Sequence, residues 1–362
     1  MEREWQVFSP IGATLLAWWE GAARPLPWRS PRTLYGTVVS EFMLQQTRVA
    51  AAIPYFQRWM ERWSTAAAAA AAPEEEILLL WAGLGYYARA RNLHRLCQIL
   101  ASSAPLPASP EEWCRLPGVG PYTAAAICSL AGLADAVPLD GNGLRILARL
   151  RAIRTPFASR QILEKTLRPL ANSLAVPGRG GAIGEALMDL GSAICLPRNP
   201  LCELCPIRGH CPGAREAEES KNTPLLLARP RREETVHRLW LWDGKMLWLQ
   251  RSSRRRLRHF YELPLLEIAA ADPSPANLTQ MDPSPADVLL VGRRTIGSVR
   301  YREVIHGGTV PANPDALEAI SGQRLDAVPI PGPHRRWIRT LLQAESLALQ
   351  AQCRGEDGKS AH

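Results

Sequence analysis

The stretch SPEEWCRLPGVGPYTAAAICSLAG, residues 109–132, carries the clearest local folding signals of the chain. Ser109, Pro110 and Glu112 predict a helix start, with a capping side chain, a proline at the first helical position and a Glu three residues after the cap. The glycines of LPGVG, residues 116–120, lead into a second predicted helix. Backbone N–H groups at such a turn can approach an anion closely, and the helix that follows adds the positive end of its dipole. A plain helix–helix turn is an equally good interpretation of this segment by itself.

The helical pattern extends on both sides of this hairpin. From residue 10 to about 210, apolar residues recur at spacings of three and four, separated by short Pro- and Gly-containing loops. We therefore predict a mainly α domain over residues 1–215. Residues 216–230 are charged and lack a strong amphipathic period, which is typical of a linker.

A second domain is expected over residues 231–348. Asp243-Gly244 lies between two apolar, aromatic runs and predicts a hairpin. Residues 288–291 and 299–305 have the composition of strands, and an amphipathic helix follows near the end of the chain. We expect an α+β domain, followed by a disordered tail at residues 349–362.

Composition limits the partners. The 362 residues carry a net charge of +9 and a pI near 9.4, which favours a polyanion and leaves DNA, RNA and anionic membrane open. No apolar run approaches the roughly 20 residues of a membrane span, and MEREWQVFSP lacks a charged start followed by an apolar core. We expect an intracellular, soluble protein with no membrane partner.

Four of the eight cysteines lie within 17 residues, in the pattern C-x6-C-x2-C-x5-C, and the other four are scattered. This clustering favours a metal site over a disulfide framework, although a disulfide pair is an alternative. Four thiolates suit zinc or an iron–sulfur cluster, and the spacing alone does not choose. The predicted ligands are Cys195, Cys202, Cys205 and Cys211. Three basic residues in or beside the loop could present positive charge to DNA phosphates: Arg198, Arg208 and His210.

Two carboxylates stand out by their surroundings. Glu41 lies in the otherwise apolar helical string VVSEFMLQQT, residues 38–47. A carboxyl held against apolar surface has a raised pKa, as a general acid needs near neutrality, whereas a solvated side chain is the ordinary alternative. Asp140 lies in PLDGNG, residues 138–143, just before a predicted helix, where helix capping is the local alternative.

The string SEFMLQQT, residues 40–47, closely resembles the corresponding motif of the adenine DNA glycosylases of the MutY type. These enzymes belong to the endonuclease III (helix-hairpin-helix) superfamily. The resemblance covers roughly residues 10–215. It is carried in family order by LPWR (26–29), WAGLGYYARARNLH (81–94), LPGVGPYTA (116–124), LDGN (139–142), GEALMDLG (184–191) and the cysteines. It implies a helix-hairpin-helix glycosylase domain with a [4Fe-4S] cluster on the four cysteines, and a Nudix-like C-terminal domain.

The resemblance also implies a reaction: an enzyme of base excision repair that flips adenine out of a mispair with 8-oxoguanine or guanine and hydrolyses its N-glycosidic bond. Glu41 would protonate adenine at N7, and Asp140 would stabilise the positive charge that develops on the deoxyribose. The implied adenine and sugar pocket contains Tyr122, Asn142 and Glu185. The resemblance implies that Gln46 and Tyr86 wedge into the base stack and that the hairpin glycines Gly118 and Gly120 contact the DNA backbone. The residues that would shape the pocket or contact the lesion strand are Arg29, Arg89, Leu26, Trp28 and Leu84. For Leu26, Trp28 and Leu84, core packing is an alternative.

Tyr122 separates this chain from its lyase relatives. In superfamily members that also cut the backbone, this place carries a lysine that forms a Schiff base with the sugar. Tyrosine therefore implies a monofunctional glycosylase and argues against the first rival, an endonuclease III-like glycosylase with lyase activity. The second rival, a non-catalytic zinc-bearing DNA-binding module, has no need of Glu41 and Asp140.

The resemblance weakens in the C-terminal domain. No Nudix box with paired glutamates is present, and the Phe-Ser-His lesion-reading turn of the family has no counterpart near residues 299–306. Substitute lesion readers would be Tyr301, Arg302 or His306. An arginine cluster could contact phosphate, or it could simply lie in a solvated loop: Arg251, Arg254, Arg255, Arg256 and Arg258. We expect a cytoplasmic, nucleoid-associated monomer of bacterial type acting on duplex DNA with A:8-oxoguanine or A:G mispairs.

Overall fold

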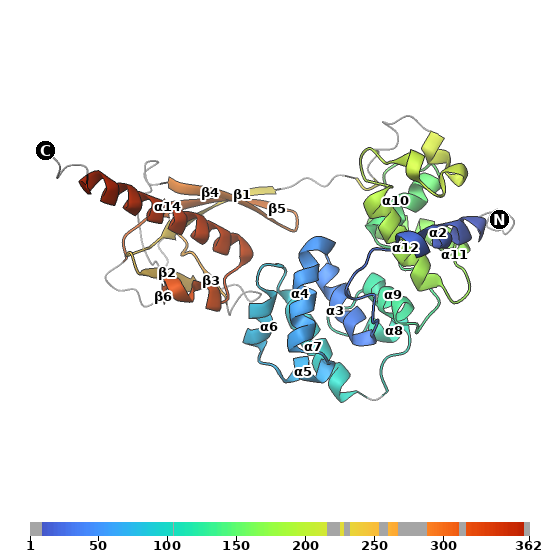
Figure 1. Cartoon of the computed structure of the whole chain (residues 1–362), viewed down its shortest axis with the longest axis horizontal. Coiled ribbons are helices and arrows are strands. Elements are labelled where there is room, and N and C mark those ends of the chain that lie inside the picture. The colour runs from blue at the N-terminus through green and yellow to red at the C-terminus, as the bar shows by residue number, and fades with distance from the viewer. Residues whose placement is uncertain are drawn as a thin grey trace. The chain divides into compact units, whose positions relative to one another are not determined.

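The computed structural model describes residues 9–103, 105–215, 225–227, 232–252, 260–266, 288–310 and 316–357. The chain forms two compact units (Figure 1). The first contains residues 1–72 and 92–228, and the second contains residues 73–91 and 229–362. Residues 73–91 thus pack with the second unit, although the sequence pattern places them inside the helical domain.

The first unit is helical, as predicted. Its helices are α2 (Ser9–Ala22), α3 (Leu34–Leu44), α4 (Val49–Arg62), α5 (Ala66–Ala71), most of α7 (Ala88–Ser102), α8 (Pro110–Trp113), α9 (Pro121–Leu130), α10 (Gly141–Leu150), α11 (Arg160–Ser173) and α12 (Gly180–Ala193). Three short 3-10 turns follow at Cys202–Leu204, Arg208–His210 and Pro212–Arg215.

One apolar core of this unit joins α2, α10, α11 and α12. It includes Leu15, Leu147, Leu167 and Leu187, each no more than 1% exposed. In α10 the sequence GNGLRILARL turns Leu144, Leu147 and Leu150 inward, because residues three or four apart share one helix face. This packing fixes the N-terminus of α10, where Asp140 lies.

The helix start predicted at Ser109 is confirmed. The Ser109 side chain accepts a hydrogen bond from the Glu112 amide, and the Glu112 carboxylate accepts one from the Ala108 amide at 2.7 Å. These reciprocal bonds satisfy amide groups that a helix N-terminus leaves unpaired. The loop that follows ends at Gly120, and α9 begins at Pro121.

The second unit contains two three-stranded sheets. One has the order β1-β5-β4, formed by β1 (Arg232–Trp240), β5 (Val299–Gly307) and β4 (Val288–Ile296), with β1 parallel and β4 antiparallel to β5. The other has the order β3-β2-β6, formed by β3 (Tyr261–Glu262), β2 (Met246–Arg251) and β6 (Leu317–Ser321). Helical segments are α6 (Glu74–Trp81), the start of α7, a 3-10 helix at Gly322–Ala327, and α14 (Gly332–Asp357).

The Asp243-Gly244 turn is confirmed, with one difference. The Asp243 carboxylate accepts hydrogen bonds from the Lys245 and Met246 amides, and Gly244 has φ +94°, which favours glycine. The strands on either side, however, enter different sheets. The predicted strands near residues 288–291 and 299–305 are confirmed in β4 and β5.

The C-terminal helix is longer than the sequence predicts. It continues to Asp357, so most of the expected disordered tail is helical, and residues 358–362 lie outside the described residues. Most of the predicted linker also lies outside them. Within the described chain, no helix is long and apolar enough to cross a membrane.

Candidate active site and iron–sulfur loop

All nine predicted site residues that belong to the first unit, the cysteines aside, line one cavity of about 840 Å³. The cavity lies among the loop before α3, the helix α3, the α8–α9 hairpin and the N-terminus of α10, with α12 as a further wall. The nine are Arg29, Glu41, Gln46, Gly118, Gly120, Tyr122, Asp140, Asn142 and Glu185. Leu26 and Trp28 also line it while being buried, so their packing and pocket-forming roles coincide.

Glu41 is held on a helix that is buried along most of its length. Thr33 caps the start of α3 by accepting a hydrogen bond from the Gly36 amide, and Val38, Phe42 and Met43 are fully buried. The Glu41 side chain faces the cavity, yet the residue is only 6% exposed. Its pKa is raised to about 8, mainly by burial and also by the charges of Asp140 and Glu185, while the cation of Arg32 opposes them. Glu41 is therefore a protonated acid at neutral pH.

Asp140 combines the two roles that the sequence left as alternatives. It is the N-cap of α10, where its Oδ1 accepts a hydrogen bond of 2.7 Å from the Gly143 amide. Its Oδ2 accepts one of 2.8 Å from the Asn142 amide side chain, and the residue also lines the cavity. Capping orients the carboxylate without removing it from the site.

Tyr122 stands at the second residue of α9, on the same cavity wall. Burial raises the pKa of its phenol well above the ordinary value, and Glu41 and Asp140 raise it further. The Arg160 guanidinium lies 6.0 Å from its ring centre. The phenol is therefore neutral, and it offers a hydrogen bond where a lysine would offer a nucleophilic amine.

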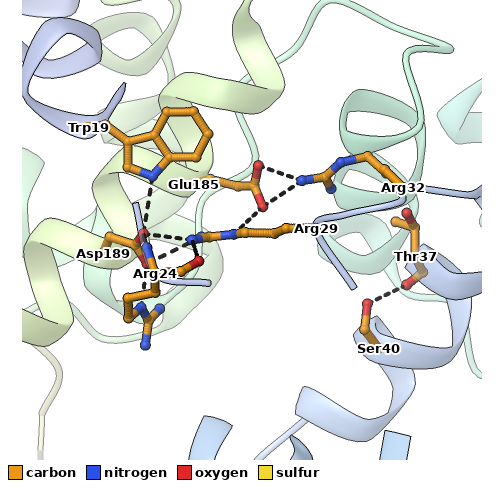
Figure 2. A network of polar contacts seen from close by, with 8 residues as sticks. All are labelled: Trp19, Arg24, Arg29, Arg32, Thr37, Ser40, Glu185 and Asp189. Atoms are coloured by element: carbon orange, nitrogen blue, oxygen red, sulfur yellow. Dashed lines mark hydrogen bonds and ion pairs between the residues drawn. The ribbon is translucent and has the colours of Figure 1, made fainter. Parts of the chain in front are cut away.

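Arg29 and Glu185 belong to an ion-pair network that covers one side of the cavity. Arg29 lies between two carboxylates of α12, donating to Glu185 at 2.8 Å and to Asp189 at 2.7 Å (Figure 2). Arg32 donates to both Glu185 oxygens, at 2.9 and 2.8 Å. Burial alone would raise the pKa of Asp189, but hydrogen bonds and charge from Arg29 and Arg24 outweigh burial and hold it below the ordinary value. Glu185 thus enters the site as the neighbour of two cations.

Sequence reasoning missed several members of this network: Trp19, Arg24, Arg32 and Asp189. One signal was available, because Glu185 and Asp189 are four residues apart in GEALMDLG and so share a helix face. The arginines that reach this face come from residues 24–32, far away in the sequence, and only the tertiary structure brings them there.

Sequence reasoning also missed Arg145, which connects the carboxylate site to the cysteine loop. Its guanidinium donates to Asn142 Oδ1 at 2.9 Å, to the Gly191 carbonyl at 2.7 Å and to the Cys195 carbonyl at 2.9 Å. Asn142 in turn donates to Asp140. Hydrogen bonds therefore run without a break from the backbone of a predicted cluster ligand to the cavity.

The four predicted cysteine ligands line one small cavity, together with Arg149. Arg149 donates to Cys195 Sγ at 3.1 Å and to the Leu196 carbonyl at 2.7 Å. The pKa of Cys205 is raised to about 11, mainly by burial and also by the other three thiols, so a cationic centre is needed to hold this sulfur as a thiolate. Four thiols around a shared cavity suit either zinc or a cluster of several irons.

The positive groups predicted beside this loop are not equivalent. Arg208 forms an ion pair with Glu203, which reduces its availability to phosphate. Arg198 and His210 are exposed. The phosphate contact expected of the loop would therefore rest mainly on Arg198 and His210.

The hairpin glycines differ in what they do. Gly118 has φ +75°, and a Cβ there would lie 2.7 Å from Asn92 Cβ and 2.9 Å from Phe42 Cε1, so only glycine fits. Gly120 has open space around it and is the N-cap of α9, where no side chain caps the first amides. This start of α9 offers the unpaired N–H groups that an anion needs.

The two predicted wedging residues have the same backbone feature. Gln46 has φ +58° and Tyr86 has φ +49°. Both values lie in the left-handed region, which residues other than glycine rarely adopt. Gln46 is exposed and lines the cavity of the first unit, whereas Tyr86 belongs to the second unit and is 50% exposed. Strained, exposed residues of this kind cluster at functional sites.

The position of Arg89 differs from that expected of a residue in contact with DNA. It is buried in the second unit, donates to the Leu84 and Gly85 carbonyls, and lies 5.4 Å from the Trp81 ring centre. Burial lowers its pKa to about 10. Its side chain holds the turn that presents Tyr86, and Leu84 is likewise largely buried in this turn.

The predicted lesion readers of the second unit are placed unequally. His306 is 4% exposed, and its Nε2 lies 2.9 Å from His237 Nδ1, so it is a poor candidate for touching DNA. Tyr301 is partly buried under Arg294, and Arg302 is exposed on β5. Arg251 is bonded to Glu318 and Tyr261, and Arg254, Arg255, Arg256 and Arg258 lie outside the described residues.

Comparison with known families shows what parts of the helical unit are similar to. Residues 39–171 match the model of the HhH-GPD superfamily base excision DNA repair proteins. Over these residues the chain is similar to this superfamily. Residues 195–211 match the iron–sulfur binding domain of endonuclease III, so the four cysteines form a [4Fe-4S] loop, and the zinc interpretation is wrong.

Relatives and a solved structure show further similarities. The chain is 40% identical to human adenine DNA glycosylase over 221 residues, covering 58% of this chain and 40% of that protein. It is 36% identical over 208 residues to the adenine DNA glycosylase of Buchnera aphidicola (Schizaphis graminum), covering 57% and 59%. A thermostable thymine-DNA glycosylase structure aligns with a TM-score of 0.51 at 25% identity, covering 60% of this chain and 99% of that one. The chain spans about half the length of the curated relatives it matches.

Proposed function

We propose that this protein is a monofunctional adenine DNA glycosylase, which flips adenine out of a mispair in duplex DNA and hydrolyses its N-glycosidic bond. The observation that carries the proposal is the sharing of one cavity by a protonated Glu41 and an Asp140 carboxylate that accepts hydrogen bonds at both oxygens. The pattern of relatives named adenine DNA glycosylase, at 34–41% identity, supports adenine as the base.

Glu41 supplies the acid in this reaction. With a pKa of about 8 it carries a proton at neutral pH, and it donates this proton to N7 of the extruded adenine. Protonation makes adenine a neutral leaving group instead of an anion. The same burial that raises the pKa keeps bulk water from competing for the proton.

Asp140 supplies the opposite charge. Cleavage of the glycosidic bond builds positive charge on the deoxyribose, and a fixed anion nearby stabilises that charge, electrostatically or by transient covalent attachment. The Gly143 amide and Asn142 orient the carboxylate, and Arg145 orients Asn142. Because these donors are in place before substrate binds, little reorganisation is needed during the reaction.

Tyr122 supports the absence of a lyase step. A phenol cannot form the Schiff base through which bifunctional relatives cut the strand, so the product is an intact strand with an abasic site. The exposed start of α9 would hold a phosphate of the backbone without reading sequence, while Gln46 and Tyr86 would fill the space that the base leaves.

The cysteine loop supports DNA binding more than chemistry. Held by Cys195, Cys202, Cys205 and Cys211, the [4Fe-4S] group supplies a fixed centre that keeps the loop folded. Arg149 anchors the same loop through Cys195 Sγ and the Leu196 carbonyl. Arg198 and His210 would then face the DNA backbone.

The second unit is proposed to be Nudix-like and to assist recognition of 8-oxoguanine opposite the adenine. Its mixed strands with the flanking helix α14 are compatible with that class. Arg302, exposed on β5, is the first candidate for a contact to the lesion or its phosphate, and Tyr301 is the second. We also propose that the protein acts as a cytoplasmic monomer on the nucleoid.

The proposal is tested by product identification. Duplexes carrying a single A:G, A:8-oxoguanine or T:G pair are incubated with the protein, and the freed base and the state of the strand are analysed separately. The proposed function predicts free adenine from the first two duplexes, intact thymine in the third, and strand scission only after alkali. Release of thymine, or scission without alkali, would instead support the endonuclease III-like rival.

A further inference from the structure

Strand β4 forms an edge of its sheet that no other described strand covers. The strand order is β1-β5-β4, and β4 is paired with β5 alone. Its nine residues therefore present one row of backbone N–H and C=O groups without a strand partner in the described part of the chain. Such an edge is a template for the addition of another strand.

The side chains of β4 protect this edge only in part. The sequence VLLVGRRTI has two arginines and a register shift near its start, but it contains neither proline nor lysine. Apolar side chains are exposed instead, at 36% for Val288, 46% for Leu289, 46% for Val291 and 39% for Ile296. Exposed apolar side chains along an edge strand are available to a partner.

A groove accompanies the edge. Helix α14 packs along β4 within the second unit (Figure 1), and a hollow of about 580 Å³ lies between them. Its walls include Leu290 and Val291 from the strand and Trp337 and Thr340 from the helix. Gly292 allows this approach, because a Cβ there would lie 2.4–2.6 Å from the Trp337 ring. An edge strand beside a helix groove is the arrangement in which PDZ and PTB domains bind extended peptides.

The charge of the groove indicates the chemistry of the occupant. Arg293 stands on the strand wall and Arg336 on the helix wall, both are exposed, and neither forms an ion pair with another described residue. The neighbouring Arg294 is paired with Glu303 and does not contribute free charge. Among the residues that the structure describes, none of those lining the groove is acidic. The two walls therefore favour carboxylates at both sides of an added strand.

We propose that the β4 edge and its groove bind an extended segment of a partner protein in which acidic and apolar residues alternate. Main-chain hydrogen bonds to β4 would provide affinity, alternate apolar side chains would enter the hollow against Trp337, and the carboxylates would pair with Arg293 and Arg336. This interaction uses residues of the second unit that the glycosylase chemistry does not use, so it is independent of the proposed function.

The test uses defined peptides and the full-length protein. Ac-EVEVEV-NH2 is prepared with an N-terminal fluorescein in place of the acetyl group and titrated by anisotropy, beside the lysine analogue Ac-KVKVKV-NH2 and the proline-interrupted Ac-EVPVEV-NH2 labelled in the same way. We expect saturable binding of the first at peptide concentrations up to about 1 mM, and binding at least about tenfold weaker for the other two. Amide hydrogen exchange of β4 should slow when the first peptide is bound.

Charge reversal makes the test specific. In the double variant Arg293→Glu and Arg336→Glu, Ac-EVEVEV-NH2 should bind at least about tenfold more weakly and Ac-KVKVKV-NH2 more tightly. Arg324→Glu is the matched control, because Arg324 is exposed in the same unit, outside the groove and without a described ion pair, and it should leave binding unchanged. No saturable binding, or an unaltered affinity in the double variant, would overturn the proposal. Equal binding of the proline-interrupted peptide would overturn it too, because the groove would then be a general anion site, as for nucleic acid.

Discussion

Glu41→Gln should make the protein more stable, and by an amount that depends on pH. In the folded protein burial raises the pKa of Glu41 from an ordinary 4.5 to about 8. Between these two pH values the unfolded chain has lost the proton that the folded protein retains, so folding takes up a proton. The free energy of unfolding of the wild type therefore falls as pH rises from 4.5 to 8. Glutamine has the same shape and does not titrate, so the variant avoids this loss.

The magnitude follows from the pKa difference. One pH unit of full proton uptake changes the free energy of unfolding by about 1.4 kcal/mol, so the stabilisation by glutamine should be about 2.5 kcal/mol larger at pH 7 than at pH 5. For a unit of about 200 residues this corresponds to an additional Tm difference of about 5–10 °C. Any effect of the substitution that is independent of pH cancels in this comparison.

The assay is urea unfolding and thermal melting of the wild type and Glu41→Gln at pH 5 and pH 7. Glu61→Gln is the matched control, since Glu61 lies exposed on α4 in the same unit, and it should change stability equally at both pH values. A stability difference between Glu41→Gln and the wild type that is identical at pH 5 and pH 7 would refute a raised pKa for this carboxyl. The assignment of Glu41 as the acid would then lose its physical basis.

Three further predictions concern the same unit. Asp140→Asn should slow adenine release by about 10²–10³-fold in single-turnover assays, because it removes one electrostatic stabiliser while an amide can still cap α10; near-normal rates would leave capping as its only role. Tyr122→Lys should form a borohydride-trappable adduct with DNA that the wild type forms weakly or not at all, and strong trapping by the wild type would contradict the monofunctional assignment. Cys202→Ser should reduce iron content and weaken duplex binding more than it alters the rate of any folded fraction, whereas full iron content with unchanged affinity would exclude Cys202 as a ligand.

Much of the helical unit could be predicted because its signals are local. The capped start at Ser109, the LPGVG turn and the cysteine spacing each depend on a few consecutive residues, and the structure contains the corresponding helix, loop and cavity. For Asp140 the sequence allowed a helix cap or a site carboxylate. The structure is compatible with both, because Asp140 caps α10 and also lines the cavity.

The parts that sequence reasoning missed depend on contacts between distant segments. Arg32 faces Glu185 across 153 positions, and Arg24 faces Asp189 across 165, so no local pattern could pair them. Arg89 looked like a DNA contact, but its burial against Trp81 is decided by packing within residues 73–91. The division of the Asp243 hairpin between two sheets likewise depends on which strands become available from elsewhere in the chain.

The placement of residues 73–91 also affects how the second unit should be tested. Deleting the C-terminal region would uncover the surface on which this segment packs, so a loss of activity would not report on lesion recognition. Arg302→Ala avoids this problem, because Arg302 is exposed on β5. If it reads the lesion, the variant should lose preference for A:8-oxoguanine over A:G, and if it contacts phosphate, both duplexes should weaken by similar factors.

The central claim is that a buried, protonated Glu41 releases adenine from mispaired duplex DNA. The most direct measurement is the single-turnover rate of free adenine release from a duplex with one A opposite 8-oxoguanine, compared between the wild type and Glu41→Gln across pH 6 to pH 10. The wild type should release adenine at a rate that falls above a pH of about 8, as the acid loses its proton, while Glu41→Gln should bind the duplex and release almost none at any pH. An active Glu41→Gln enzyme, or a wild type that frees no adenine from this duplex, would contradict the claim.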